Sequence, residues 1–368
     1  MIKEKFKIGL GSLERLLEPK TPPLIGVDVS SSSVKLVELS DLGKGRIGVE
    51  RYAIEPLPRD GVVDGNIMNL EAVTEALSRG WKRMGTRIKN VALAVPAAAV
   101  ITKKITVPAG QREEDLEIQV ETEANQYIPF ALDEVNLDFQ VLGPAPNSPE
   151  DIEVLIAASR KDKVDDRVAV AEAAGLKTLI MDVDSYAIQT ALEFVRKQLP
   201  EGGADQVIAL VGIGAALMNI NVFRNDQALY NREQPFGGSQ LTQDIQQRYN
   251  LTPEEAEVAK RSGGLPDDYR TEVLQPFIET CALEVARALQ FFFTSSEYTQ
   301  VDYVVLAGGS AALPGIAEAV AHRVQSRALV ANPFAAMTPS SKIKLQQLTA
   351  DAPALMVACG LAMRGFDP

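Results

Sequence analysis

"LIGVDVSSSSVKLVELS", residues 24–40, is the stretch on which the interpretation of the fold depends. An apolar run ends at Asp28, four serines follow after Val29, and a second apolar run begins directly after them. This order predicts two antiparallel strands joined by a tight polar turn. The turn is either an ordinary solvated hairpin tip, since serine is common in turns, or a concavity whose backbone N–H groups and hydroxyls hold a phosphate. In the second case Asp28 would bind the accompanying cation, directly or through water.

A second hairpin of the same kind follows half a chain later. Its first strand, in "VIALVGIGAALMNINVF", ends at Gly212, which is 184 residues after Asp28 (212 minus 28) in a chain of 368. A strand-turn-strand unit that recurs at half-length favours two related halves.

The segments around the hairpins alternate between buried strands and amphipathic helices, which is typical of an α/β protein. From Ile101 the pattern changes. An exposed strand is followed by the helix "REEDLEIQVETEANQY", which Pro129 ends, and then by two strands. This strand-helix-strand-strand block predicts a small inserted subdomain.

The predicted boundaries follow these changes of pattern. We expect an N-terminal amphipathic segment, a first half into which the subdomain is inserted and to which the chain returns, a second half with a helical part, and a closing helix of small residues. The amphipathic segment spans residues 1–22, the first half 23–100, the insertion 101–178 and the return 179–200. The second half spans 201–353, with its helical part at about 238–300, and the closing helix spans 354–368.

Composition excludes several classes of function. The formal net charge of -12 opposes binding to nucleic acid. His322 is the sole histidine and has no partner for zinc or acid-base chemistry, while Cys281 and Cys359 are too far apart in the sequence to indicate a thiolate metal site. The longest uncharged apolar run, residues 207–218, is shorter than the roughly 18 residues that a spanning helix needs.

The N-terminal segment has a different character. Its apolar residues recur every three or four positions, and three lysines lie off that face. We expect a helix that docks on this protein or on a partner, or that lies on a membrane surface. It lacks the apolar centre and cleavage site of a secretory signal, so the sequence predicts a cytoplasmic protein.

The phosphate interpretation gains support from the segments that follow the hairpins. No Walker A sequence is present, and "GIGAAL" at residues 212–217 lacks the third glycine of the dinucleotide fingerprint. Instead "FGGSQLT", "AEVAK" and "VVLAGGS" follow the second hairpin in that order. This ordered set resembles the phosphate-1, phosphate-2 and adenosine motifs of the actin-like ATPase superfamily. Together with "QVETEANQYIPFALDEVNLDFQVLG" it is similar, over nearly all of residues 20–366, to the PilM family of type IV pilus assembly proteins, relatives of the bacterial cell-division actin homologue.

The resemblance implies an α/β protein with the actin-like two-domain ATPase fold, built of duplicated RNase H-like halves with an inserted subdomain. It implies ATP and Mg as cofactors, with Asp28 near the metal and Asp184 positioning the attacking water. The residues that it places around ATP are Asp28, Ser30, Ser31, Ser32 and Lys35 in the first half, and Gly212, Gly214, Gly237, Gly238, Glu257, Lys260, Gly308, Gly309 and Ser310 in the second. Taken alone, Glu257 and Lys260 are also typical of a solvated helix pair, and Gly308 and Gly309 of a plain strand-to-helix turn.

The resemblance further implies a scaffold at the cytoplasmic face of the inner membrane that binds the cytoplasmic N-terminal tail of PilN, in a groove beside residues 101–178. Other pilus assembly proteins, motor ATPases and further copies of the chain are left open as partners. Gly212 stands where relatives carry an aspartate, so we expect at most a slow ATPase. The alternatives are a filament-forming actin-like ATPase and a small-molecule phosphotransferase of the same fold.

Overall fold

The structure, a computed structural model, describes residues 22–146, 148–225 and 227–367. These residues form two units. The first contains the described residues up to Thr190 and those from Val357 onward, and the second contains Ala191–Met356. The predicted amphipathic segment lies outside the described residues apart from Pro22.

A mixed sheet forms the centre of the first unit. Its strands, in spatial order, are β10 (Lys177–Val183), β6 (Asn90–Val95), β1 (Ile25–Val29), β2 (Ser33–Asp41) and β3 (Ile47–Pro56). β1, β2 and β3 form an antiparallel meander, whereas β6 runs parallel to both β1 and β10. The apolar runs on either side of the serines are β1 and β2, so the hairpin predicted from residues 24–40 is confirmed.

Two helices, α1 (Leu70–Met84) and α3 (Lys161–Ala173), cover one face of this sheet. α1 begins where the Asn69 side chain accepts a hydrogen bond from the Ala72 N–H, and it ends at Gly85 in the left-handed conformation. The apolar side chains between these helices and the sheet are buried, which stabilises the fold by about 1.5 to 3 kcal/mol for each large side chain. They include Ile25, Val27, Leu36, Leu77, Leu93 and Val170.

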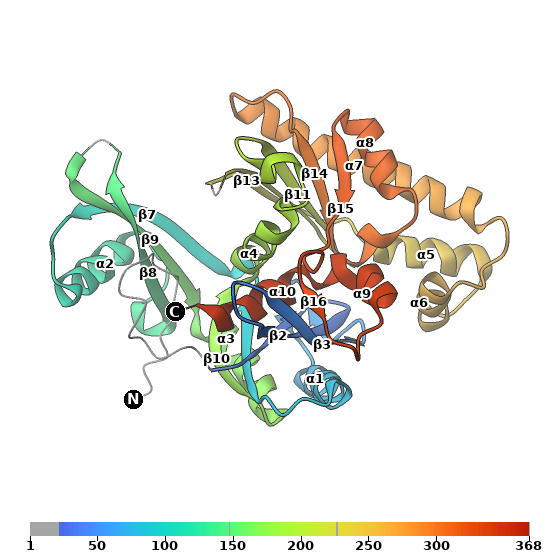
Figure 1. Ribbon diagram of the computed structural model, residues 1–368, viewed down its shortest axis with the longest axis horizontal. Coiled ribbons are helices and arrows are strands. Elements are labelled where there is room, and N and C mark those ends of the chain that lie inside the picture. Colours follow the sequence, from blue (N-terminus) through green and yellow to red (C-terminus); the bar gives the residue numbers. More distant parts are fainter. Residues whose placement is uncertain (1–21, 147, 226, 368) are drawn as a thin grey trace. The chain divides into compact units, whose positions relative to one another are not determined.

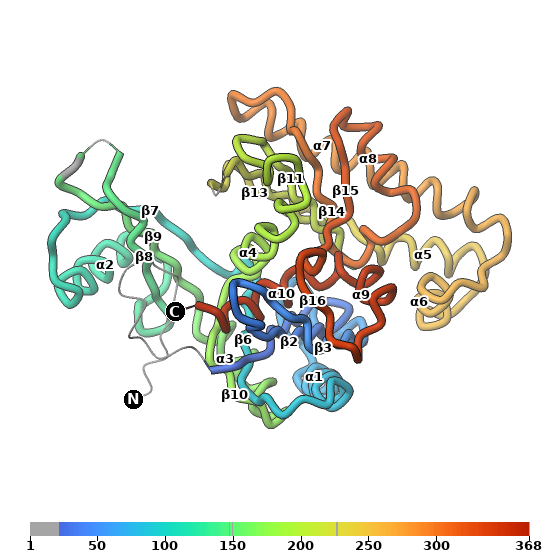
Figure 2. Tube along the Cα trace, viewed as in Figure 1, coloured from blue at the N-terminus to red at the C-terminus, as the bar shows by residue number. Residues whose placement is uncertain are grey.

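The opposite face of the sheet packs against α4 (Asp184–Arg196) and α10 (Met356–Met363). Glycines allow these elements to approach backbone to backbone. A Cβ atom added at Gly26 would lie 2.1 Å from the carbonyl oxygen of Ala358, and one added at Gly360 would lie 1.7 Å from that of Ala187. Figure 2 shows α10, in red, beside the blue strands that begin the chain's described part. The small residues of the last helix therefore serve close packing.

The insertion is an antiparallel three-stranded sheet with the strand order β7 (Val100–Pro108), β9 (Ser148–Arg160), β8 (Val135–Ala145). The helix α2 (Glu113–Tyr127) packs on one face of it (Figure 1). The predicted order strand, helix, strand, strand is confirmed. The buried residues of this layer include Ile105, Leu116, Val120, Ala124, Val154 and Ile156.

The second unit repeats the sheet of the first. Its strands, in spatial order, are β13 (Gln227–Gln234), β12 (Met218–Arg224), β11 (Val207–Ile213), β14 (Tyr303–Ala307) and β15 (Arg327–Val330). β11, β12 and β13 form the antiparallel meander, and β14 runs parallel to β11 and β15. Three antiparallel strands followed by two parallel ones thus occur twice, and the predicted duplication is confirmed.

The helices of the second unit are α5 (Gly238–Tyr249), α6 (Pro253–Ser262), α7 (Gln275–Ser295), α8 (Ile316–Val324) and α9 (Leu345–Asp351). Helix α7 supplies much of the core through one continuous apolar face that contacts the sheet. The buried side chains there include Val211, Ile213, Met218, Ile220, Phe277, Val285 and Phe292.

Several short elements connect these parts. They are β4 (Val62–Val63), β5 (Asn66–Ile67), η1 (Ala97–Ala99), η2 (Leu132–Glu134), η3 (Pro200–Gly203), η4 (Arg270–Leu274), η5 (Gly309–Ala312), β16 (Thr338–Pro339), η6 (Ala352–Leu355) and η7 (Arg364–Phe366). Within the described ranges, no helix is long and apolar enough to cross a membrane.

The substitution Gly360→Ala should destabilise the protein, because the added methyl group must displace the backbone of α4. We expect the free energy of unfolding to fall by about 2 to 3 kcal/mol in urea titrations. Gly309→Ala is the matched control, since a Cβ atom there meets nothing within 4 Å. Equal stability of the two variants would contradict the close packing of α10 on α4.

Candidate functional site

The first hairpin brings three predicted site residues into direct contact. Asp28 on β1 lies opposite Lys35 on β2. The Lys35 ammonium donates hydrogen bonds to Asp28 Oδ2 (2.7 Å) and to Ser30 Oγ (2.8 Å). Ser30 closes the turn, because its N–H and its hydroxyl both donate to the carbonyl oxygen of Ser33 (3.1 and 3.0 Å). One turn therefore holds a carboxylate, an ammonium and a hydroxyl.

The remaining predicted residues of the first unit lie at strand ends. Ser31 and Ser32 form the half-buried tip between β1 and β2. Asp184 directly follows β10 as the first residue of α4, and its Oδ1 accepts a hydrogen bond from the Ala97 N–H (2.9 Å). Asp184 thereby joins the start of α4 to η1, which follows the neighbouring strand β6.

Sequence reasoning missed Arg167, a buried residue of α3 that is 2% exposed. Its guanidinium donates hydrogen bonds to the carbonyl oxygens of Gly65 (2.7 Å) and Lys163 (3.0 Å). Its Nε is also buried and has no hydrogen-bond partner among the described residues. Burying a cation with an unsatisfied N–H costs free energy of folding, so a compensating negative charge is expected nearby.

That negative charge comes from the predicted acids. Burial lowers the pKa of Arg167, and the charges of Asp184, Asp166 and Asp28 oppose this shift. Arg167 therefore lies within electrostatic range of both carboxylates that the sequence placed in the site. Its position was visible in the sequence, because it falls one helical turn after Val164 on the buried face of α3.

In the second unit, two predicted turns touch backbone to backbone. Gly308 has a φ of 87°, and a Cβ atom added to it would lie 2.4 Å from the carbonyl oxygen of Ile213. Gly238, the first residue of α5, donates its N–H to the carbonyl oxygen of Gly214 (2.9 Å). At position 308, only glycine both adopts the left-handed backbone conformation readily and leaves space for the adjacent carbonyl oxygen of Ile213. The second hairpin, the glycine pair and the turn after β14 thus form one cluster.

Further contacts complete this cluster. The Ser310 hydroxyl donates to the carbonyl oxygen of Gly214 (3.3 Å), and the Ser239 N–H donates to that of Ala215 (2.8 Å). A Cβ atom at Gly237 would lie 2.5 Å from the Ala215 oxygen. The structure therefore brings together the glycines and Ser310 that the sequence placed in the second half.

Lys260 connects α6 to this cluster. Its ammonium donates hydrogen bonds to Glu257 Oε2 (2.6 Å), Thr242 Oγ1 (2.8 Å) and the carbonyl oxygen of Gly238 (3.3 Å). Burial acts to raise the pKa of Glu257, but the hydrogen bond and charge of Lys260 hold it below its ordinary value. Thr242, which sequence reasoning missed, is buried and also donates to Glu257 Oε2 (2.8 Å).

Both clusters fit a nucleotide with its metal. The turns at Gly214, Gly238 and Gly308 pack closely against neighbouring protein atoms and form compact turns of the kind that bind phosphates, and Lys35 and Lys260 supply ammonium groups. Across residues 22–146, 148–225 and 227–367, no group of three or more His, Cys, Asp or Glu side chains could hold a metal. Mg²⁺ keeps several waters and usually binds one or two carboxylates together with phosphates, and Asp28 could supply one such carboxylate.

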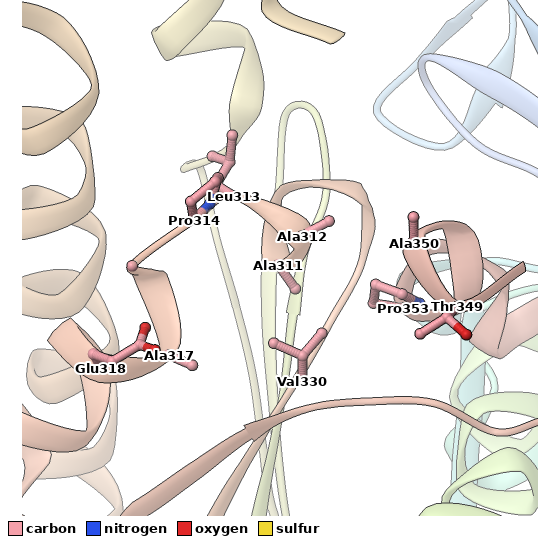
Figure 3. A pocket seen from close by; sticks show the side chains of 11 residues that line it. Ala311, Ala312, Leu313, Pro314, Ala317, Glu318, Val330, Thr349, Ala350 and Pro353 are labelled. Atoms are coloured by element: carbon pink, nitrogen blue, oxygen red, sulfur yellow. The ribbon is translucent and has the colours of Figure 1, made fainter. Parts of the chain in front are cut away.

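A cavity of about 320 Å³ continues from the turn after Ser310 (Figure 3). It lies between η5, the start of α8, the end of β15 and α9. Its walls are mostly apolar, with Glu318 and Thr349 as the polar side chains among them. The other lining residues include Ala311, Ala312, Leu313, Pro314, Val330 and Pro353.

A second, narrow cavity of about 10 Å³ lies between the inserted sheet and the ends of β6 and β10. This volume holds about one water molecule. The inserted sheet contributes Asn136 and Asp138 from β8, which alternate with residues that pack toward α2. The other walls are Val95, Val100, Ala157, Ala158, Ser159 and Val183.

Asp138 is the charged side chain of this narrow cavity. Its Oδ1 accepts a hydrogen bond from the Phe139 N–H (2.9 Å), while its buried Oδ2 has no hydrogen-bond partner within the described part of the chain. Burial raises the pKa of Asp138 to about 6, although the Phe139 N–H and the Arg364 charge oppose the shift. Arg364 also forms ion pairs with Asp182 (3.4 Å) and Asp367 (3.2 Å), and burial raises the pKa of Asp182.

Comparisons with known proteins agree with this arrangement. The family described as type IV pilus assembly protein PilM matches residues 26–366. A solved PilM-PilN type IV pilus biogenesis complex contains a chain that is 28% identical, with a TM-score of 0.76 over 95% of this chain and 100% of that one.

More distant relatives share the fold. Cell division protein FtsA of Bacillus subtilis (strain 168) is 23% identical over 355 residues, which cover 84% of this chain and 78% of FtsA. The ethanolamine utilization protein EutJ of Carboxydothermus hydrogenoformans is 18% identical, with a TM-score of 0.53 over 94% of this chain and 90% of EutJ.

The substitution Asp138→Asn should change how stability depends on pH. Because the pKa of Asp138 is raised in the folded protein from 3.8 to about 6, its protonated form adds stability below about pH 4, and this is lost as the pH rises through about 6. Asparagine does not titrate, so the variant should lack this loss in thermal melts between pH 4 and 7. The exposed Asp133→Asn is the control. Parallel curves for Asp138→Asn and the unaltered protein would refute the raised pKa.

Proposed function

The chain belongs to the PilM family of type IV pilus assembly proteins, and from this we propose that it is an ATP-binding scaffold that holds the cytoplasmic N-terminal tail of PilN. The match to PilM in the solved complex with PilN carries the proposal. The same matches confirm the actin-like two-domain fold predicted from the sequence. We place the scaffold at the cytoplasmic face of the inner membrane, where a bitopic partner would present its tail. Motor ATPases, other pilus proteins and further copies remain candidates for additional contacts.

Both units contain residues that would bind nucleotide. In the first, Asp28 would hold Mg²⁺ through water, and Lys35 with the serine turn would bind phosphate oxygens. The existing contact of Lys35 with Asp28 at 2.7 Å supports this role, because it shows that the two opposite charges share one turn.

In the second unit the backbone would do most of the binding. Gly212 and Gly214 with the pair Gly237 and Gly238 would surround phosphates, and the hydrogen bond from the Gly238 N–H to the carbonyl oxygen of Gly214 keeps these turns together. Glu257, Lys260 and the turn Gly308 to Ser310 would contact the adenosine. Lys260 hydrogen-bonds to Glu257 and to the carbonyl oxygen of Gly238, and Ser310 to that of Gly214, which supports the assignment because these contacts hold the groups in one cluster.

Hydrolysis should be slow or absent. Gly212 offers no carboxylate where relatives carry one, so the second hairpin lacks an electrostatic group near the reacting phosphate. Loss of one such group typically costs about 3 kcal/mol of barrier, or about a hundredfold in rate. Asp184, which we propose as the residue that positions water, cannot restore that charge alone.

The PilN tail would bind where the inserted sheet meets the core. The face of that sheet turned away from α2 presents Asn136 and Asp138 to the narrow cavity, and Val95 and Val183 form the opposite wall. An extended peptide can dock against a sheet by backbone hydrogen bonds and a few side-chain contacts. Because the cavity has room for only about one water molecule, its walls must part to admit the peptide.

MgATP should raise the melting temperature of the unaltered protein. If ATP exceeds its dissociation constant a thousandfold, occupancy stabilises the folded state by about 4 kcal/mol. The substitution Asp28→Ala should remove most of this shift, whereas the exposed Asp60→Ala should retain it. Steady-state phosphate release should stay near background. A melt indifferent to MgATP would refute nucleotide binding, and brisk release would refute the hydrolysis claim.

A synthetic peptide with the N-terminal residues of the cognate PilN should bind the full chain at micromolar concentration in calorimetry. Asn136→Arg should abolish binding, because the long side chain fills the narrow cavity. Asn125→Arg makes the same change on the exposed side of α2 and should bind normally. Absence of binding to folded, ATP-loaded protein would contradict the scaffold proposal.

A further inference from the structure

A row of four residues crosses the second sheet beside the phosphate hairpin. Gly212 on β11 pairs with Ala307 on β14 on one side and with Asn219 on β12 on the other. Asn219 in turn pairs with Glu233 on β13. In an antiparallel pair, residues directly opposite each other present their side chains to the same face of the sheet. Gly212 and Asn219 therefore share one face.

The neighbours along each strand identify that face. Val211 and Ile213 on β11, and Met218 and Ile220 on β12, all lie in the core that packs against α7. Side chains alternate along a strand. The amide of Asn219 accordingly points to the face turned away from this core, and it is half-buried there.

The distances place the side chain of Asn219 next to position 212, where relatives carry an aspartate. A Cβ atom built at Gly212 would lie 3.9 Å from the Cβ atom of Asn219, and no other side chain comes within 4 Å of it. The side chain of Asn219 thus starts beside the place where a side chain at position 212 would start. Gly212 and Ala307 are small, so they leave space beside the amide on that side.

The amide of Asn219 takes no part in the hydrogen bond between the side chains of the next row across the sheet. There Asn221 is buried and accepts a hydrogen bond from the Asn231 side chain. For Asn219, the described part of the chain contains no hydrogen bond of the side chain. A half-buried amide without such a bond, next to a phosphate hairpin, is available to a ligand.

We infer that Asn219 provides the polar group that the second hairpin turns toward the hydrated cation or phosphate of a bound nucleotide, in the place that Gly212 leaves without a carboxylate. The inference rests on the proposed nucleotide binding. An amide can accept a hydrogen bond from a metal-bound water or donate one to a phosphate oxygen, but it carries no charge. It therefore supports binding without supplying the negative charge that Gly212 lacks.

Calorimetric titration of ATP into the full chain, with Mg²⁺ and with EDTA, tests this role. Asn219→Ala should weaken MgATP binding about fivefold to tenfold, as expected for one lost hydrogen bond. Asn231→Ala, an exposed amide one row away, is the matched control and should bind like the unaltered protein. Asn219→Asp keeps the shape of the side chain and adds a charge, so it should increase the ratio of affinities with and without Mg²⁺ several-fold.

The outcomes separate the two proposals. If the unaltered protein binds no ATP, both the nucleotide proposal and this inference are wrong. If it binds MgATP, and folded Asn219→Ala and Asn219→Asp both bind it equally well with an unchanged Mg²⁺ dependence, the inference about Asn219 alone is wrong. The isosteric Asn219→Asp variant decides the matter if Asn219→Ala does not fold.

Discussion

The second half of the molecule depends on one close approach, in which the turn after β14 meets the hairpin between β11 and β12 backbone to backbone. Gly308 permits it, because its positive φ and the absence of a side chain place it directly against Ile213. The parallel pairing of β11 with β14 brings both turns to the same edge of the sheet. The Gly238 N–H then donates to the carbonyl oxygen of Gly214, which fixes where α5 begins, and the Lys260 ammonium donates to the carbonyl oxygen of Gly238. A larger residue at Gly308 would separate all of these groups.

In the proposed nucleotide binding, the two halves would contribute different chemistry. The first hairpin contributes charged side chains, Asp28 and Lys35, which hold each other at 2.7 Å. The second would contribute backbone and the neutral amide of Asn219. Strong binding needs hydrogen bonds and complementary charge, whereas rapid hydrolysis also needs charge placed where it develops in the reaction. This division of roles is suited to a protein that uses a nucleotide as a structural element.

Features that follow from local pattern could be predicted from the sequence. The apolar runs on either side of the serines predicted the first hairpin, and the recurrence of such a hairpin predicted the duplication. Glycine pairs indicated the positions of the turns. Residues that act through distant neighbours were missed. Thr242 and Asn219 depend on strand register and helix packing, and the raised pKa of Asp138 depends on its burial, which outweighs the opposing charge of Arg364. Arg167 was also missed, but the sequence held a signal for it, because it lies among the apolar positions of the buried face of α3.

The nucleotide carried by the purified full chain tests the central claim most directly. Protein prepared without added nucleotide should be denatured, and the released nucleotides should be separated and quantified by chromatography. A scaffold that binds ATP tightly and hydrolyses it slowly should release nearly one ATP for each chain, with little ADP. Release of mainly ADP, or of no nucleotide from folded protein, would contradict the account.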